Sequence, residues 1–171
     1  VKKIKFSSNC SLENFGPPGF FSYYSLTEIT IPKSIQIIPS HLFEHCHFLQ
    51  TLQFEEGSTL KEIGEYSFSN TKITKICLPE SVQIIKKAAF SNNLYLKEIA
   101  FEGEVIEDEA FIKTGITSFT LSNNTTKIGS NAFSNCYSLT TINIDIDNSN
   151  LTEIGASAFE ETSITSINIP Q

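Results

Sequence analysis

The sequence has 171 residues, enough for one domain with a sizeable core, and 40% of them are hydrophobic, which excludes a disordered chain. The formal net charge is −7 and all 12 basic residues are lysine, which disfavours binding to nucleic acid or to an anionic membrane. No run approaches the roughly 18 consecutive apolar residues of a membrane-spanning helix, so we expect no membrane contact by this segment.

Eight short runs of alternating apolar residues follow one another along the chain. In chain order they cover residues 4–6, 29–31, 52–54, 76–78, 99–101, 119–121, 142–144 and 167–169. Their period of two and their content of β-branched residues predict short strands. One strand per repeat, always in the same direction, predicts a parallel sheet whose apolar side chains point into the core.

A phenylalanine precedes each strand from the second onward and marks a repeat. The series is Phe20, Phe43, Phe68, Phe90, Phe111, Phe133 and Phe159. An apolar residue stands five positions before each of these phenylalanines and another five or six positions after it. Repeats that cannot bury their apolar sides alone stack into a solenoid, so we expect the phenylalanine rings to form a column inside it.

Two of the segments that lead into the phenylalanines, residues 128–133 and 154–159, have the form Ile-Gly-x-x-Ala-Phe. This form predicts a tight turn into a short helical or 3₁₀ piece on the convex side of the solenoid. Gly64, Gly129 and Gly155 are expected to take unusual backbone angles there.

Three repeats are one residue shorter than the others after the phenylalanine, where Ile73, Ile116 and Ile164 follow at five positions instead of six. Each should distort the stack locally. The opening segment 14–19 is irregular and is expected to bulge outward. We interpret residues 1–171 as a single repeat domain without visible end caps, a fragment of a longer array whose open ends permit end-to-end self-association.

The repeat resembles the BspA-like leucine-rich repeat. The segments Leu26-Thr-Glu-Ile-Thr-Ile-Pro-Lys-Ser-Ile35 and Ile73-Thr-Lys-Ile-Cys-Leu-Pro-Glu-Ser-Val82 carry the resemblance, and Cys46 and Cys136 stand at that family's cysteine position. The resemblance implies an α/β solenoid with a parallel sheet on its concave face. It also implies adhesion to host or matrix proteins at the surface of bacteria or mucosal protozoan parasites, and no catalytic residues.

The predicted binding surface is the outward row of the sheet, because solenoids bind through their extended concave face. The side chains of this row are small and polar, with few of the residue types that dominate binding energy, so we expect weak or multivalent contacts. The row consists of Glu28, Thr30, Thr51, Gln53, Lys75, Cys77, Glu98, Ala100, Ser118, Thr120, Thr141, Asn143, Ser166 and Asn168.

A metal site and a catalytic site are the other candidates that the sequence offers. His41, His45 and His47 flank Cys46 and have residue types that bind metal, but Cys46 is explained by the repeat, so we expect no metal. No G-x-S-x-G motif or phosphate-binding loop is present, so we expect neither an enzyme nor a cofactor. Asn9, Asn123, Asn124 and Asn150 begin N-x-[ST] sequons, which matter only in a secreted protein.

The four cysteines, Cys10, Cys46, Cys77 and Cys136, are expected to be unpaired, because stacking separates Cys46 from Cys136 by four repeats. The leading hypothesis is a cell-surface or secreted module that binds a host or matrix protein. The alternative is an intracellular (cytoplasmic) scaffold with the same fold that holds a protein partner.

Overall fold

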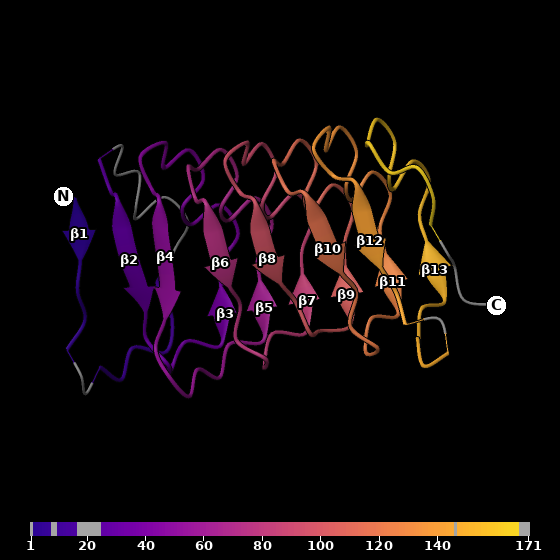
Figure 1. Cartoon of the computed structure of the whole chain (residues 1–171). Helices are drawn as coiled ribbons and strands as arrows, with labels where there is room; N and C mark the ends of the chain where they lie inside the picture. The colour runs from indigo at the N-terminus through magenta and orange to yellow at the C-terminus, as the bar shows by residue number, and fades with distance from the viewer. Residues whose placement is uncertain (1, 8–9, 17–24, 146, 168–171) are drawn as a thin grey trace.

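The computed structural model describes residues 2–7, 10–16, 25–145 and 147–167, and it is a β-solenoid with two rows of parallel strands (Figure 1). The arrows of the two rows point in opposite directions, because the chain crosses from one row to the other within each repeat. The long-strand side consists of β1 (Lys3–Ile4), β2 (Glu28–Ile31), β4 (Thr51–Phe54), β6 (Lys75–Cys77), β8 (Glu98–Ala100), β10 (Ser118–Thr120) and β12 (Thr141–Asn143). The short-strand side consists of β3 (Ile37–Ile38), β5 (Glu62–Ile63), β7 (Ile84–Ile85), β9 (Val105–Ile106), β11 (Lys127–Ile128) and β13 (Glu153–Ile154).

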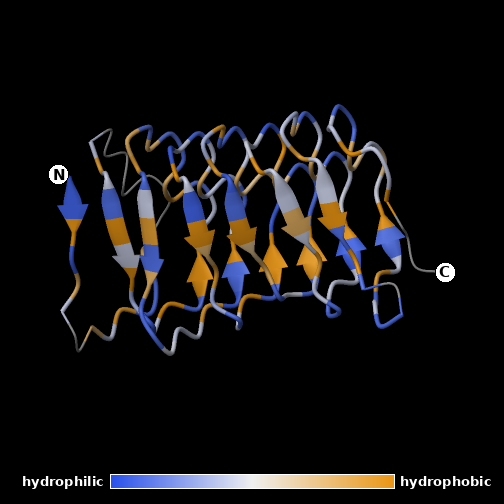
Figure 2. Ribbon diagram, in the orientation of Figure 1, coloured by the Kyte–Doolittle hydropathy of each residue, from blue (hydrophilic) through white to orange (hydrophobic). Residues whose placement is uncertain are grey.

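The long strands overlap seven of the eight predicted alternating runs, each beginning one residue earlier, and their pairing is parallel as expected. Most of the eighth run, 167–169, lies outside the described residues. Each long strand begins with a polar residue that is followed by an apolar one (Figure 2). The strand row is nevertheless divided into three sheets, β1-β2-β4, β6-β8 and β10-β12. The divisions fall where β6 and β10 join the row, which are the strands of two of the repeats that are one residue short. The predicted local distortion is therefore confirmed at these two places.

The short-strand side forms one uninterrupted six-stranded sheet, which the sequence analysis did not predict. Its strands contain the apolar residue that stands five positions before each phenylalanine, for example Ile63 in β5 and Ile128 in β11. These isoleucines are fully buried. The sequence predicts that these isoleucines are apolar core residues, but a strand of two residues is too short to show the alternation by which strands are predicted.

The phenylalanine column is confirmed. Phe43, Phe68, Phe90, Phe111 and Phe133 are each 0% exposed. Neighbouring rings stack with centroids 5.2 to 5.5 Å apart and interplanar angles of 14° or less. Phe159 continues the stack at 5.5 Å from Phe133 but is only partly buried. Phe20 lies outside the described residues.

The expected helical pieces on the side of the phenylalanines are wrong, because the described residues form turns there and no helix. In every repeat from Phe43 to Phe159, the residues two positions before and two positions after the phenylalanine have positive φ between 51° and 60°. This regular left-handed conformation prevents a helix. The N–H groups of His41, Phe43 and His45 donate to carbonyls of the next repeat, at 2.8 to 2.9 Å. The same three bonds recur in each repeat up to that of Phe133, and we name these stacked turns around the phenylalanines the turn wall.

The expected unusual backbone angles of Gly64, Gly129 and Gly155 are also wrong, because positive φ among the described glycines occurs at Gly16 and Gly57. Close approach explains these glycines instead. A Cβ at Gly129 would lie 2.4 Å from the backbone nitrogen of Asp108, and one at Gly64 would lie 2.5 Å from the carbonyl oxygen of Ile38. The glycines therefore permit the tight spacing of consecutive repeats.

Buried polar side chains line the turn wall at the family's cysteine position, three residues after the phenylalanine. The Asn93 amide is 0% exposed and donates to the carbonyls of Phe68 and Phe90 at 2.7 and 2.8 Å. Thr71 donates its hydroxyl to the same amide from the neighbouring repeat. The Cys136 thiol donates to the carbonyl of Phe111 at 3.0 Å. These side chains add hydrogen bonds to buried carbonyls of the turns; the Phe111 carbonyl also accepts from the N–H of Thr114 at 3.2 Å.

Residues 17–19 of the irregular segment 14–19 lie outside the described residues, and so does Asn168 of the predicted face.

Candidate protein-binding face

The outward side of the long strands is here named the long-strand face and consists of the predicted binding residues from Glu28 to Ser166. The alternation of the strands turns their apolar residues inward, so the positions between them are exposed; Glu28 and Thr30 are half-buried. The structure brings these residues together as two parallel rows. Their use in binding, and the concavity of the face, stay predictions.

Neighbouring side chains on the long-strand face are paired across the strands. The Lys3 ammonium lies 2.6 Å from the Glu28 carboxylate, and the Lys75 ammonium lies 2.5 Å from that of Glu98. The hydrogen bond that Lys75 donates to Glu98, and the negative charge of that carboxylate, raise the pKa of Lys75 above its usual value. The Asn143 amide donates to the Thr120 hydroxyl at 3.2 Å. Cross-strand pairs of this kind fix the side chains that a ligand would meet.

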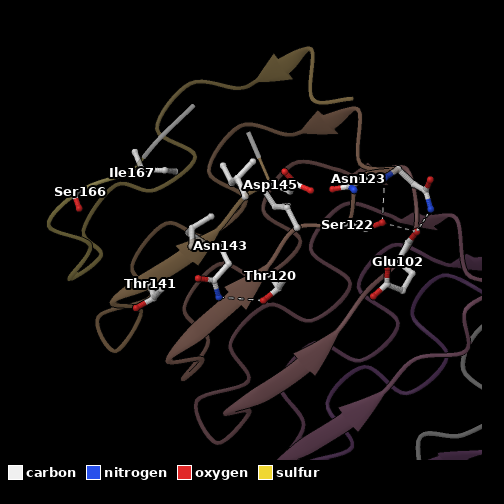
Figure 3. Close-up of a pocket in the computed structure, with 13 residues that line it drawn as sticks. Glu102, Thr120, Ser122, Asn123, Thr141, Asn143, Asp145, Ser166 and Ile167 are labelled. Atoms are coloured by element: carbon white, nitrogen blue, oxygen red, sulfur yellow. Dashed lines mark hydrogen bonds between the residues drawn. The ribbon is translucent and has the colours of Figure 1, made fainter. Parts of the chain in front are cut away.

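Shallow hollows follow the long-strand face. One of about 780 Å³ lies beside β10 and β12, where Thr120, Thr141 and Asn143 meet Asn123 and Asp145 from the following loops (Figure 3). A second, of about 650 Å³, lies around Thr51, Gln53 and Lys75. Both are open to solvent, and the larger one is mainly polar. An extended partner surface fits them better than an enclosed small molecule does.

Asp145 gives the larger hollow a negative charge. A hydrogen bond from the Asn148 side chain holds the pKa of Asp145 below its usual value, and hydrogen bonds from the Asp147 backbone and the Asn123 side chain act in the same direction. The carboxylate is therefore ionised at neutral pH and is already bonded to its own loop.

Two of the three histidines share one partner, because Nε2 of His45 lies 3.6 Å from the Glu44 carboxylate that His41 also contacts. Nδ1 of His41 lies 2.6 Å from the Glu44 carboxylate, and the His41 ring stacks on Tyr66. His47 points its Nδ1 at the carbonyl of Asn70, 3.1 Å away. In the part of the chain that the structure describes, no three His, Cys, Asp or Glu side chains are grouped as metal ligands.

The cysteines divide by burial. Cys10, Cys77 and Cys136 are free thiols, and Cys77 is exposed on the long-strand face. Cys46 and Cys136 are buried on the turn wall. Burial raises the pKa of Cys46 to about 11 and also raises that of Cys136. Both buried thiols are therefore protonated, and inert, at neutral pH.

The sequon residues Asn123, Asn124 and Asn150 are exposed, while Asn9 lies outside the described residues. The described residues contain no helix of the length and apolar character that crossing a membrane requires.

Sequence reasoning missed one group of candidate functional residues. Phe48, Leu94, Tyr95 and Tyr137 are exposed in the turns that enter the long strands, beside the long-strand face and not on it. The signal was present, because these turns belong to the repeats that are not shortened after the phenylalanine.

Comparison with known proteins agrees with this architecture. The model of the BspA type leucine rich repeat region matches residues 16–140 and 104–171, with six copies, and the chain therefore belongs to this family. Families of leucine-rich repeats typically provide non-enzymatic, protein-binding modules. No match is found among curated proteins.

Solved structures with the same fold come from bacteria. A leucine-rich repeat protein from Bacteroides ovatus is 22% identical, with a TM-score of 0.71 over 94% of this chain and 47% of its own. The pneumococcal vaccine antigen PcpA is 29% identical, with a TM-score of 0.60 over 74% of this chain and 32% of its own. A leucine rich cell surface protein from Faecalibacterium prausnitzii is 22% identical, with a TM-score of 0.56 over 83% of this chain and 47% of its own. The chain spans less than half the length of each of these proteins.

Proposed function

We propose that this chain is a cell-surface or secreted recognition module that binds a host or matrix protein through the long-strand face. The observation that carries the proposal is the double row of mostly exposed and polar side chains along the long strands, above a stacked aromatic core. A surface of this kind has the regular geometry for extended contacts and no enclosed pocket for chemistry.

The relatives support the surface location. One neighbour is described as a cell surface protein and another as a vaccine antigen, and both contain the same repeat fold. Exposed sequons at Asn123, Asn124 and Asn150 are compatible with secretion in a cell that glycosylates asparagine.

The location is tested by labelling intact source cells with an antibody raised against this chain. Staining without permeabilisation supports the proposal. Staining only after permeabilisation contradicts it and favours the intracellular scaffold, whose partner would then be sought by pull-down from the cytoplasm.

The binding face is tested with a matched pair of variants against purified host matrix proteins. Gln53 lies on the long-strand face, and Gln36 is exposed beside the short strand β3. We expect Gln53→Lys to weaken the affinity about tenfold, the size of a moderate interface effect. Gln36→Lys should leave the affinity unchanged. Equal effects of the two substitutions would remove the long-strand face from the proposal.

We also propose that the outer strands of this chain pair end to end between copies. β1 and β13 each have a neighbouring strand on one side only. Unpaired strand edges favour such association. Sedimentation velocity over a range of concentrations should show growth beyond the monomer, and a single monomeric species throughout would contradict it.

A further inference from the structure

The exposed large apolar side chains gather in one kind of turn. Phe48, Leu94, Tyr95 and Tyr137 are 51%, 63%, 53% and 63% exposed, and all four precede a long strand. Ile37 is the remaining one among the described residues and lies on the other side. The outward row of the long-strand face, by contrast, contains no aromatic residue.

An additional hydrogen-bonded turn explains why these side chains are exposed. In the full-length repeats, the N–H groups of Leu49, Leu96 and Leu139 donate to carbonyls three residues earlier, at 2.9 to 3.1 Å. The two central residues of each turn are the pairs 47–48, 94–95 and 137–138. Their side chains project to solvent because the next residue, a leucine, is anchored in the core.

Lysine ammonium groups lie between these turns, at the level of the shortened repeats. Lys72 replaces the central pair in one of them, and its ammonium lies 5.5 Å from the Phe48 ring centroid and 5.9 Å from that of Tyr95. In the next shortened repeat, Gly115 takes the same place. The Lys97 ammonium lies 3.0 Å from where a Cβ of Gly115 would be. Aromatic residues and lysines therefore alternate along what we name the aromatic edge: Phe48, Lys72, Tyr95, Lys97 and Tyr137.

The aromatic edge is basic in an acidic protein. Residues 46–50, 70–74, 92–97, 113–117 and 135–140 contain no Asp or Glu, although the chain has 19 of them. Within the described ranges, neither Lys72 nor Lys97 has an ion-pair partner. The ammonium groups of Lys72 and Lys97 offer carboxylates a charge partner, and the exposed rings, two of them beside Lys72, offer apolar side chains a contact surface.

We propose that the aromatic edge is a second binding surface, which takes an extended, acidic segment of a partner protein that also carries aromatic or aliphatic side chains. Neighbouring repeats lie about 4.8 Å apart, so Phe48 and Tyr137, four repeats from each other, are about 19 Å apart along the solenoid. An extended segment of about six residues spans this distance. Every second side chain of an extended segment faces the same way, so acidic and apolar side chains taken in turn at these positions match the lysines and rings.

The test is a displayed library of random peptides of about ten residues, selected on the whole chain. We expect the selected peptides to be rich in Asp or Glu together with aromatic or aliphatic residues. Lys72→Glu and Tyr95→Ser should each weaken the binding of a selected peptide at least about tenfold. The control Lys61→Glu makes the same charge change at an exposed lysine ahead of β5 and should leave binding unchanged.

Gln53→Lys should also leave peptide binding unchanged, which separates this surface from the long-strand face. Because all these side chains reach solvent, circular dichroism should show unaltered folding. Three results would overturn the proposal: no peptide is selected, the selected peptides carry no excess of acidic residues, or Lys72→Glu binds them as well as the native chain does. Binding to sialylated or sulfated glycans on an array, lost in Lys72→Glu and without any selected peptide, would assign the edge to an anionic glycan instead.

Discussion

The two sides of the solenoid differ in how continuous they are. The short-strand sheet and the turn wall run without interruption from the repeat of Phe43 to that of Phe159, whereas the long-strand side is divided into three sheets. The long-strand ladder is present wherever the next core residue of the incoming repeat stands six positions after its phenylalanine, and it is lost at β6 and β10, where that residue stands five positions after. One residue of turn length thus decides strand pairing on one side and leaves the other side intact.

This difference shows which side holds the array together. The stacked rings, the buried amides and thiols and the close-approach glycines all lie on the continuous side. The long-strand side is free to vary in turn length and in outward residues, which suits a surface that meets partners. Substitutions on the continuous side should therefore cost more stability than substitutions on the long-strand side.

The largest effect is expected from Phe111→Ala. Phe111 is 0% exposed and stacks between Phe90 and Phe133, so its removal leaves a cavity that rigid neighbours cannot fill. We expect a loss of about 3–5 kcal/mol in the free energy of unfolding, measured by chemical denaturation. Phe159→Ala, at a partly buried position of the same stack, should cost less. An unchanged midpoint for Phe111→Ala would contradict the assigned role of the phenylalanine stack.

Asn93→Ala should have the next largest effect. The substitution removes the amide that donates to the carbonyls of Phe68 and Phe90, and both carbonyls stay buried without this hydrogen bond. We expect a loss of about 1–3 kcal/mol in the free energy of unfolding. The matched control is Asn143→Ala on the long-strand face, for which about 0.5 kcal/mol or less is expected. Equal losses would mean that the two sides contribute alike to stability.

Alkaline pH should also act on the continuous side. The pKa of Cys46 is about 11 in the folded chain, against 9.0 for the thiol without burial, so the folded state favours the protonated thiol. The resulting stabilisation is complete below pH 9 and is lost as the pH rises towards 11. Denaturation midpoints should fall over this interval, and by less in Cys46→Ala. An identical fall in both proteins would exclude Cys46 as a contributor.

The smallest effect is expected from a change of turn length. Insertion of one glycine after Lys72 should give the repeat of β6 its sixth residue and allow β4 and β6 to pair. Each new hydrogen bond is worth about 0.5–1.5 kcal/mol, so exchange of the β6 amides should slow by roughly twofold to tenfold. Insertion of one glycine after Lys61, beside the short-strand sheet, should instead speed exchange there. No slowing in β6 would mean that turn length is not the cause of the interruption.

The sequence predicted the parts of this fold that depend on side-chain period. The long strands and the phenylalanine stack follow from columns of apolar residues, and the distortions follow from the missing residue before Ile73 and Ile116. The turn wall could not be predicted in the same way. The left-handed positions before the phenylalanines hold His41, Tyr66, Ala88, Glu109, Asn131 and Ser157, which share no chemistry. Their conformation is imposed by hydrogen bonds to the next repeat and not by residue type.

The candidate site was predicted as far as its outward rows, because alternation alone decides which residues of a strand face solvent. The aromatic edge was not predicted, since Phe48 and Tyr95 are aromatic residues of the kind that usually pack in a core. Only the turn that anchors Leu49 and Leu96 shows that the residues before them are exposed.

The turn wall gives the solenoid an electrical direction. Each of its bonds between repeats runs from an N–H of one repeat to a carbonyl of the following repeat, as from Phe68 to Ala89 and from Phe90 to Ala110. The peptide dipoles of this wall therefore add along the axis, as they do in an α-helix. The wall is partly negative towards its first repeat and partly positive towards its last. Copies that meet along the axis are attracted when they follow one another head to tail and repelled when they meet with like ends.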